Sequence, residues 1–205
     1  MAGVQEIEQD GSPGEVMPRE QQVRAAALRL FRDKGYHATS MRDIAEAVGI
    51  NKGSLYSYIR SKEDLLIPFF ERAMGLLLAE IEAISADASL SPTERLKQAI
   101  KAHILNVAEH HDILTVYLSE WRQLTADSLS TVRGQRERYA ALFLDILQDG
   151  QKKGEFRSEL DARITALGMI GMCNYLFRWY RGDGRLAPEQ IADVLTDLLL
   201  RGVLP

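Results

Sequence analysis

The sequence contains a single cysteine, Cys173, so the chain can form neither an internal disulfide nor a zinc site that needs several cysteines. It has no uninterrupted apolar run of about 18 residues, the length that a transmembrane helix requires. Its first residues lack the basic and apolar regions of a secretory signal peptide. They are acidic instead, with Glu6, Glu8, Asp10 and Glu15. We therefore expect a cytoplasmic protein without a membrane partner.

Several signatures of enzymes are also missing. There is no Gly-x-Ser-x-Gly elbow, no paired Glu-x-x-His motif and no glycine loop that would cradle a phosphate. A helical enzyme is therefore the disfavoured alternative, and we expect no catalytic residue and no cofactor. His103, His110 and His111 suggest a metal sensor as a further alternative. No additional ligand follows at a dependable spacing, so we expect no metal site.

The charges are distributed unevenly along the 205 residues, whose net charge is −4. Residues 1–16 hold four acids and no Lys or Arg, and their low apolar content predicts a disordered tail. Residues 17–62 hold nine bases and four acids. A basic segment in an acidic chain indicates a polyanion partner. A non-specific architectural DNA-binding protein should be basic throughout, which makes that alternative less favourable.

Apolar residues recur at helical spacing through most of the chain, and no alternating strand pattern of useful length occurs. The first predicted helix ends at Gly35, and Ser40, Asn51 and Ser61 are suited to cap three more. The fourth helix is long, and further helices follow it to the end of the chain. We therefore predict an all-α protein.

Pro68 falls inside the fourth helix and removes one backbone hydrogen bond from it. We expect a kink or a local break near residues 64–68, because the carbonyl of Asp64 loses its helical donor. Such a hinge would couple the segments on either side of it.

The segment from Ser40 to Lys62 has the pattern of a helix-turn-helix. Gly49 and Ile50 separate two short helices, and the second turns Leu55 and Ile59 inward. Its other side chains would face the major groove of DNA, where hydroxyl, amide and ammonium groups contact bases and phosphates. The predicted DNA-binding residues are Ser40, Arg42, Asn51, Lys52, Gly53, Ser54, Tyr56, Ser57, Tyr58 and Lys62.

The run from Thr39 to Tyr56, followed by Ser61-Lys62-Glu63-Asp64-Leu65, closely resembles the DNA-binding domain of TetR-family regulators. The resemblance covers about residues 19–65 and departs at Tyr58, where His is usual, and at Ile59, where Phe is usual. It implies an all-helical, homodimeric repressor that binds double-stranded operator DNA. Residues 17–65 would form the three-helix DNA-binding domain, and the fourth helix would join it to a ligand-binding and dimerisation domain, residues 66–205. Activation in place of repression remains open.

The second half also resembles the TetR-family branch that responds to acyl-CoA thioesters, in motifs such as Gly154-Glu155-Phe156-Arg157. The resemblance implies a small-molecule effector. An acyl-CoA needs an apolar channel and cations for its phosphates. The predicted ligand-binding residues are Trp121, Arg122, Met169, Met172, Leu176, Phe177 and Arg178. A broad aromatic pocket of the multidrug type is the alternative, as is a purely structural core.

The last predicted helix carries a row of aliphatic residues that suits a dimer interface. We assign this interface to Val194, Leu195, Leu198 and Leu199. Gly168 and Gly171 would let an earlier helix approach closely, so that two helices from each subunit form a four-helix interface.

Overall fold

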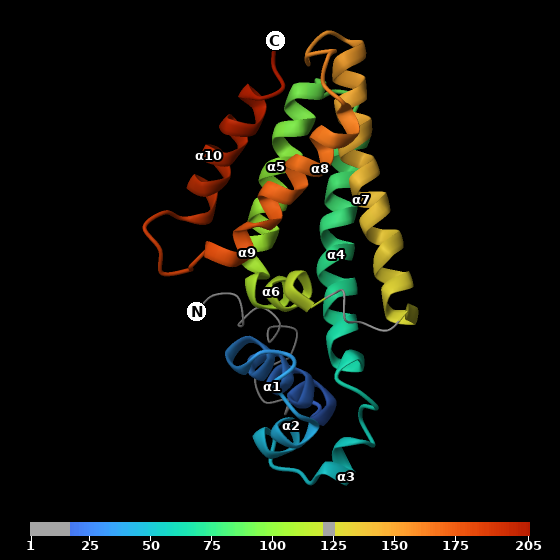
Figure 1. Cartoon of the computed structure of the whole chain (residues 1–205), viewed down its shortest axis with the longest axis vertical. Coiled ribbons are helices and arrows are strands. Elements are labelled where there is room, and N and C mark those ends of the chain that lie inside the picture. Colours follow the sequence, from blue (N-terminus) through green and yellow to red (C-terminus); the bar gives the residue numbers. More distant parts are fainter. Residues whose placement is uncertain (1–16, 121–125) are drawn as a thin grey trace. The chain divides into compact units, whose positions relative to one another are not determined.

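The structure, a computed structural model, describes residues 17–120 and 126–205, and helices are the regular elements throughout these ranges. They are α1 (Arg19–Lys34), α2 (Met41–Ala47), α3 (Lys52–Leu55), α4 (Glu63–Ala86), α5 (Pro92–Glu109), α6 (His111–Glu120), α7 (Ala126–Lys152), α8 (Ala162–Asn174), α9 (Leu176–Trp179) and α10 (Pro188–Arg201) (Figure 1). The all-α prediction is confirmed. The predicted tail, residues 1–16, lies outside the described residues. Within those ranges, no helix combines the length and apolar character needed to cross a bilayer.

The chain forms two compact units. The first comprises Met1–Arg72 with His110–Leu129, and the second comprises Ala73–Glu109 with Ser130–Pro205. Helices α4 and α7 contribute residues to both units. The predicted domain boundary between residues 65 and 66 concerns function and stays a prediction. By packing, the first unit is larger than the predicted DNA-binding segment because it includes α6.

Local capping explains where the first three helices begin and end. Gly35, with a φ of 90°, and Gly49, with a φ of 69°, follow α1 and α2 at positions that side chains disfavour. Ser40 caps α2, as the sequence predicted, and Asp43 completes a capping box with it. The buried core beneath these helices comprises Val23, Ala26, Ala27, Phe31, Ile44, Leu55 and Ile59.

Helix α6 packs against α1 within the first unit. Arg32 Nη1 on α1 donates to Asp112 Oδ2 on α6 over 2.9 Å. His111 and Arg32 both lower the pKa of Asp112, so this carboxylate stays charged to lower pH than usual. The rings of Phe70 and Tyr117, with centroids 4.5 Å apart, pack α4 and α6 together. The first unit therefore holds the helix-turn-helix on a base made from α4 and α6.

The second unit is organised around α5, which packs against α8, α9 and α10. Lys101 on α5 pairs with Asp193 on α10 over 2.5 Å. Helices α4 and α7 lie side by side in this unit (Figure 1), and Arg138 pairs with Glu82 between them over 2.8 Å. Phe143, Ile146 and Leu147 of α7 are buried with the aliphatic face of α5 in the core.

The motif Gly154-Glu155-Phe156-Arg157 forms the turn after α7. The Glu155 carboxylate accepts hydrogen bonds from the backbone N–H and hydroxyl of Thr93, at 3.0 and 2.7 Å, and so caps α5. Phe156 packs against Gly150, where an added β-carbon would lie 2.1 Å from its ring. Arg157 donates to the Gly202 carbonyl over 2.6 Å. The motif therefore ties three parts of the second unit together.

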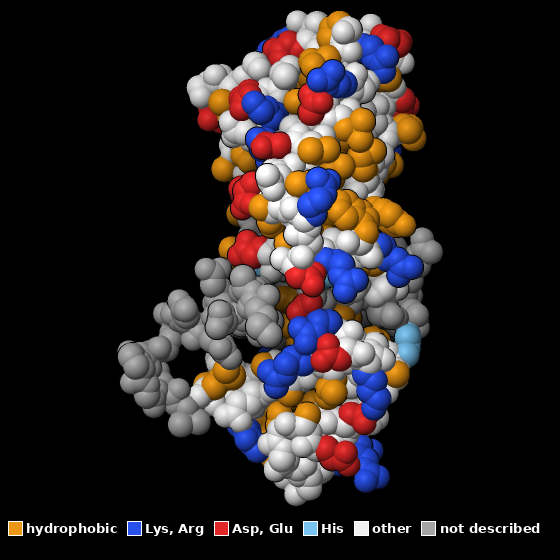
Figure 2. All heavy atoms as spheres, turned by 90° about the vertical axis from the view of Figure 1, so that its left-hand side faces the viewer, with side chains coloured by type: hydrophobic (Ala, Val, Ile, Leu, Met, Phe, Trp, Pro, Cys, Tyr) orange, Lys and Arg blue, Asp and Glu red, His pale blue; other side chains and the backbone are white. Residues whose placement is uncertain are grey.

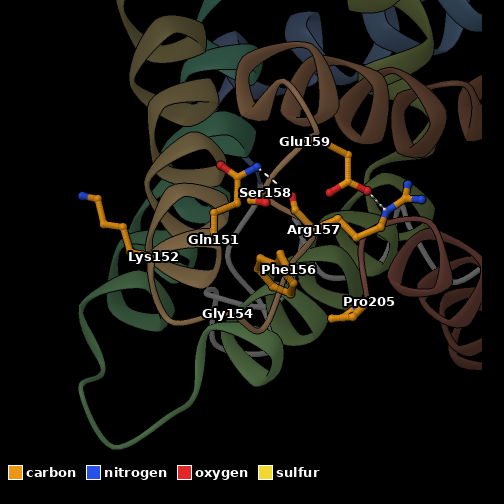
Figure 3. Close-up of a pocket in the computed structure, with 8 residues that line it drawn as sticks. All are labelled: Gln151, Lys152, Gly154, Phe156, Arg157, Ser158, Glu159 and Pro205. Carbon is orange, nitrogen blue, oxygen red and sulfur yellow. Dashed lines mark hydrogen bonds and ion pairs between the residues drawn. The ribbon is translucent and has the colours of Figure 1, made fainter.

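A hollow of about 570 Å³ lies beside this turn (Figure 3). Gln151 points from α7 toward the turn and donates to the carbonyls of Arg157 and Leu160, at 3.0 and 2.8 Å. Arg157 and Glu159 form an ion pair at 3.7 Å. Since these polar groups bind one another, we assign the lining of this hollow a structural role.

Helix α4 runs without interruption through Pro68, so the local break that the sequence allowed does not occur. The missing N–H of Pro68 leaves the Asp64 carbonyl without its helical donor, as predicted. Arg24 on α1 supplies the replacement, because its Nη1 donates to the Asp64 carbonyl over 2.9 Å. Pro68 thus creates an acceptor by which α1 is joined to α4.

We expect Arg24→Ala and Pro68→Ala to be coupled in a double-mutant cycle. Arg24→Ala removes the donor to the Asp64 carbonyl, and a hydrogen bond from a charged group contributes about 1.5–3 kcal/mol. In a Pro68→Ala background the alanine N–H satisfies that carbonyl, so Arg24→Ala should cost about 1 kcal/mol less in free energy of unfolding. Urea unfolding of the four proteins measures this difference. Strictly additive costs would contradict the coupling.

Candidate nucleic-acid interface and ligand-binding body

The helix-turn-helix presents one apolar and one polar side at α3. Helical hydrogen bonding continues past Leu55, because the Ile59 N–H donates to the Leu55 carbonyl over 3.2 Å. Leu55 and Ile59 are buried, as the sequence predicted. The opposite side of this segment faces solvent, where a major groove can reach it.

Two tyrosines dominate the exposed side. Tyr56 is 46% exposed and Tyr58 is 41% exposed, so both hydroxyls can reach a DNA backbone. The Lys52 ammonium lies 5.8 Å from the centre of the Tyr56 ring. Lys52, Tyr56 and Tyr58 are therefore accessible to a partner, and their contacts with DNA stay predictions.

Several of the other predicted DNA-binding residues have structural roles. Asn51 Oδ1 accepts from the Ser54 N–H over 2.7 Å, which caps α3. The Ser57 hydroxyl donates to the Ser54 carbonyl, also over 2.7 Å. A β-carbon on Gly53 would lie 3.2 Å from Asn51 Oδ1, so glycine here leaves room for the cap as well as for a partner. The DNA contacts of these residues stay predictions.

At the start of α2, Ser40 donates to Asp43, while Lys34 pairs with the same carboxylate over 2.8 Å. Lys34 and then Ser40 lower the pKa of Asp43, so the capping carboxylate remains ionised well below its usual range. Arg42 pairs with Glu46 over 2.7 Å on the exposed side of α2. Exposed pairs of this kind are weak, so Arg42 can exchange Glu46 for a phosphate.

Lys62 is engaged within the first unit. Its ammonium donates to the carbonyls of Tyr36 and Thr39, at 2.6 and 2.9 Å, and lies 4.4 Å from the centre of the Tyr36 ring. The phosphate contact predicted for Lys62 therefore competes with two internal hydrogen bonds. The geometry supports a role in holding the start of α4 against the α1–α2 turn.

The predicted ligand-binding residues are not all on one surface. Met169 and Leu176 are buried in the second unit, and Phe177 is half-buried. Met172 and Arg178 are exposed. Trp121 and Arg122 lie outside the described residues. Met169 and Leu176 remain candidates to line a site for an apolar ligand, whereas Met172 and Arg178 face solvent.

A buried polar network crosses the second unit. His103 Nδ1 lies 2.6 Å from the Tyr139 hydroxyl, and His103 Nε2 lies 3.1 Å from Asn174 Oδ1. Burial lowers the pKa of His103 to about 4, so the ring is neutral near pH 7. Tyr139 then donates to Nδ1, and Nε2–H donates to Asn174. Both ring nitrogens are thus occupied, and the described residues contain no cluster of three metal-binding side chains.

Asn106, one helical turn after His103, was not predicted from the sequence. Its side chain is buried, and its Oδ1 has no hydrogen-bond partner among the described residues. A buried acceptor without a partner is costly unless a ligand or water supplies a donor. Cys173 is buried too, and burial raises the pKa of its thiol to about 12, which suits a core residue.

Helices α8 and α10 each expose large apolar side chains, and Figure 2 shows orange side chains gathered into a face on the side that carries α10. Val194 is 60% exposed and Leu198 is 55% exposed, as an interface requires. Large apolar side chains are also exposed on and just after α8, at Ile164, Leu167, Met172 and Tyr175, and on α9, at Trp179.

Leu199 does not belong to this face. It is only 8% exposed and packs inside its own chain, and Leu195 is half-buried. Positions 191, 195 and 199 follow the inner side of α10, whereas 194 and 198 follow the outer side. A hollow of about 310 Å³ lies beside α10 and involves residues of both its sides. It is lined by Trp179, Tyr180, Arg181, Gly184, Arg185, Leu186, Ile191, Val194 and Leu195.

Comparison with known proteins gives extensive similarity. The chain is 28% identical over 195 residues to the HTH-type transcriptional repressor KstR2 of Mycobacterium tuberculosis, covering 95% of this chain and 97% of that protein. It is 25% identical to the fatty acid metabolism regulator protein of Bacillus subtilis over 187 residues, covering 91% and 96%. A crystal structure of AibR in complex with isovaleryl coenzyme A and operator DNA aligns with a TM-score of 0.77 and 29% identity, over 89% of this chain and 98% of that one.

Two family models match different parts of the chain. "Bacterial regulatory proteins, tetR family" matches residues 23–67, which contain the helix-turn-helix. "Tetracyclin repressor-like, C-terminal domain" matches residues 89–203, more than half of the chain. With the helix-turn-helix and the helical second unit described above, these matches place the chain in the TetR family of transcriptional regulators.

Proposed function

We propose that this protein is a cytoplasmic transcriptional repressor that binds double-stranded operator DNA as a homodimer. It leaves the DNA when an acyl-CoA or related lipid-like ligand binds the second unit. The observation that carries the proposal is the exposed polar side of α3, with Lys52, Tyr56 and Tyr58 outward over the buried Leu55 and Ile59. This arrangement supports DNA recognition, and membership of a family of transcriptional regulators supports the inference that the protein is not an enzyme.

The relatives support an acyl-CoA effector. AibR was crystallised with isovaleryl coenzyme A and operator DNA together, and a Bacillus subtilis relative is a fatty acid metabolism regulator. In this chain the buried Met169 and Leu176 supply apolar surface for an acyl chain. The unpartnered oxygen of Asn106 supplies an acceptor for an amide N–H, a group that the CoA arm carries. We therefore add Asn106 to the candidate ligand-binding residues.

The exposed face of α8 and α10 supports the homodimer. Two copies of this face, related by a two-fold axis, would bury Val194 and Leu198 against the partner. A dimer matches the two half-sites of a palindromic operator, so its symmetry serves DNA recognition directly.

The test starts by selecting a duplex from a random pool with the purified protein. Acyl-CoA thioesters of short, medium and long chain are then titrated against the protein–duplex complex, with free CoA as the control. We expect one chain-length class to release the duplex and free CoA to leave it bound. Release by hydrophobic cationic compounds and by no acyl-CoA would instead support the multidrug alternative. Failure to enrich any duplex would contradict sequence-specific DNA binding.

A further inference from the structure

Arg60 follows the α3 turn directly and has no role in the site described above. Its backbone N–H donates to Asp64 Oδ2 over 2.8 Å, which fixes the main chain at the start of α4. The side chain itself is exposed. Within residues 17–120 and 126–205, its guanidinium has no hydrogen-bond or ion-pair partner.

Most other bases of the segment 17–62 are already engaged. Four of them pair with acids: Arg24 with Glu20, Arg32 with Asp33 and Asp112, Lys34 with Asp43, and Arg42 with Glu46. Arg24 also donates to the Asp64 carbonyl, and Arg19 donates to Gln22 and to the Val48 carbonyl. Lys62 donates to the carbonyls of Tyr36 and Thr39. Arg32, and to a smaller extent Arg29, lowers the pKa of Asp33, so Arg29 also faces an acid. Few of the nine bases in this segment can therefore bind DNA without first giving up a contact that they already make.

Lys52 and Arg60 are the exceptions, and they lie in one row. Lys52, Tyr56 and Arg60 are spaced four residues apart, and helical hydrogen bonding reaches Ile59. Lys52 lies in α3, Tyr56 lies in the turn that follows it, and Arg60 lies in a bend beyond that turn. All three residues of the row are exposed, whereas Leu55 and Ile59 between them are buried. Two unpaired cations thus flank an exposed tyrosine on the proposed DNA-contacting surface.

We propose that Arg60, the last residue of this row, binds a DNA phosphate. It would provide a positive charge at this surface, where the Lys62 ammonium is occupied by two carbonyls of the protein. A guanidinium can donate two parallel hydrogen bonds to one phosphate, and here it breaks no internal pair in order to do so. The inference rests on the proposed DNA-binding function and identifies one residue of that surface.

The experiment measures the affinity of the full-length protein for a non-operator duplex over a series of salt concentrations. Each phosphate contact contributes about 0.9 to the slope of log affinity against log salt. Arg60→Ala should therefore lower the slope by about 1.8 for a dimer, while Arg60→Lys should keep it. Arg29→Ala is the matched control, since it removes an exposed arginine from α1, and it should leave the slope unchanged.

Lys62→Ala completes the set. Because its ammonium binds two carbonyls, we expect a lower midpoint of thermal unfolding with the slope retained. A slope loss for Lys62→Ala with none for Arg60→Ala would overturn the proposal. Equal slopes for Arg60→Ala and Arg29→Ala would also overturn it. The same holds if Arg60→Ala changes the preference among selected duplexes without changing the slope. Wild-type protein that binds no duplex would refute the proposed function itself, a result distinct from these.

Discussion

A protein carrying Val194→Glu and Leu198→Glu is expected to be a folded monomer with at least about 100-fold lower affinity for a selected palindromic duplex. Both side chains are exposed on the outer side of α10, so glutamate does not disturb the core of the subunit. Across a two-fold interface the same substitutions would bury four unpaired carboxylates, which is strongly unfavourable. The monomer then loses the gain from binding two linked half-sites.

Sedimentation equilibrium measures the assembly, and fluorescence anisotropy measures the affinity for the duplex. Ala141→Glu with Gln148→Glu, two exposed positions on α7, is the matched control and should stay dimeric. Leu199→Glu should behave differently from both, because it places a carboxylate in the core and should lower the free energy of unfolding. A double variant at 194 and 198 that remains dimeric would place the interface on another face.

The second large effect is loss of stability in acid caused by His103. Burial lowers the pKa of His103 in the folded protein to about 4, from an ordinary value of 6.5. The unfolded chain therefore binds a proton below pH 6.5, whereas the folded protein does not until about pH 4. Stability falls as the pH decreases through this window, by about 3 kcal/mol in total, and this contribution levels off below it.

His103→Gln isolates this contribution. Glutamine cannot titrate, yet it can donate to Asn174 and accept from Tyr139, so its free energy of unfolding should decline less steeply between pH 6.5 and 4. Urea unfolding at several pH values measures both profiles, and the carboxylates titrate alike in each protein. His37→Gln, at an exposed histidine, should follow the wild-type profile. Parallel profiles for His103→Gln and wild type would show that His103 does not control the acid sensitivity.

Much of the first unit could be predicted from the sequence, because its signals are local. A capping serine or asparagine acts within three residues, as Ser40 and Asn51 do. Helical spacing places Leu55 and Ile59 inside without reference to any other segment. The fold class and the helix-turn-helix follow from such short-range patterns.

The candidate site was less predictable, because charge counts do not reveal partners. Arg24 illustrates this. The sequence showed that Pro68 deprives the Asp64 carbonyl of its helical donor, but it did not show that the Arg24 guanidinium, forty residues earlier, donates to that carbonyl. Asn106 gave no pattern at all, because a buried amide oxygen without a partner can be recognised only after the helices pack.

The all-α class, the caps and the inward side of α3 could be predicted without a structure, since each depends on neighbours within about one helical turn. The packing of the helices was needed to see that the Lys62 ammonium binds two carbonyls while the Arg60 guanidinium has no partner among the described residues, and that Leu199 faces inward while Leu198 faces outward. In both cases the candidates are chemically alike and lie one or two residues apart. Their roles differ because their surroundings differ. Lys62 meets backbone carbonyls and Leu199 meets apolar surface, whereas Arg60 and Leu198 meet solvent.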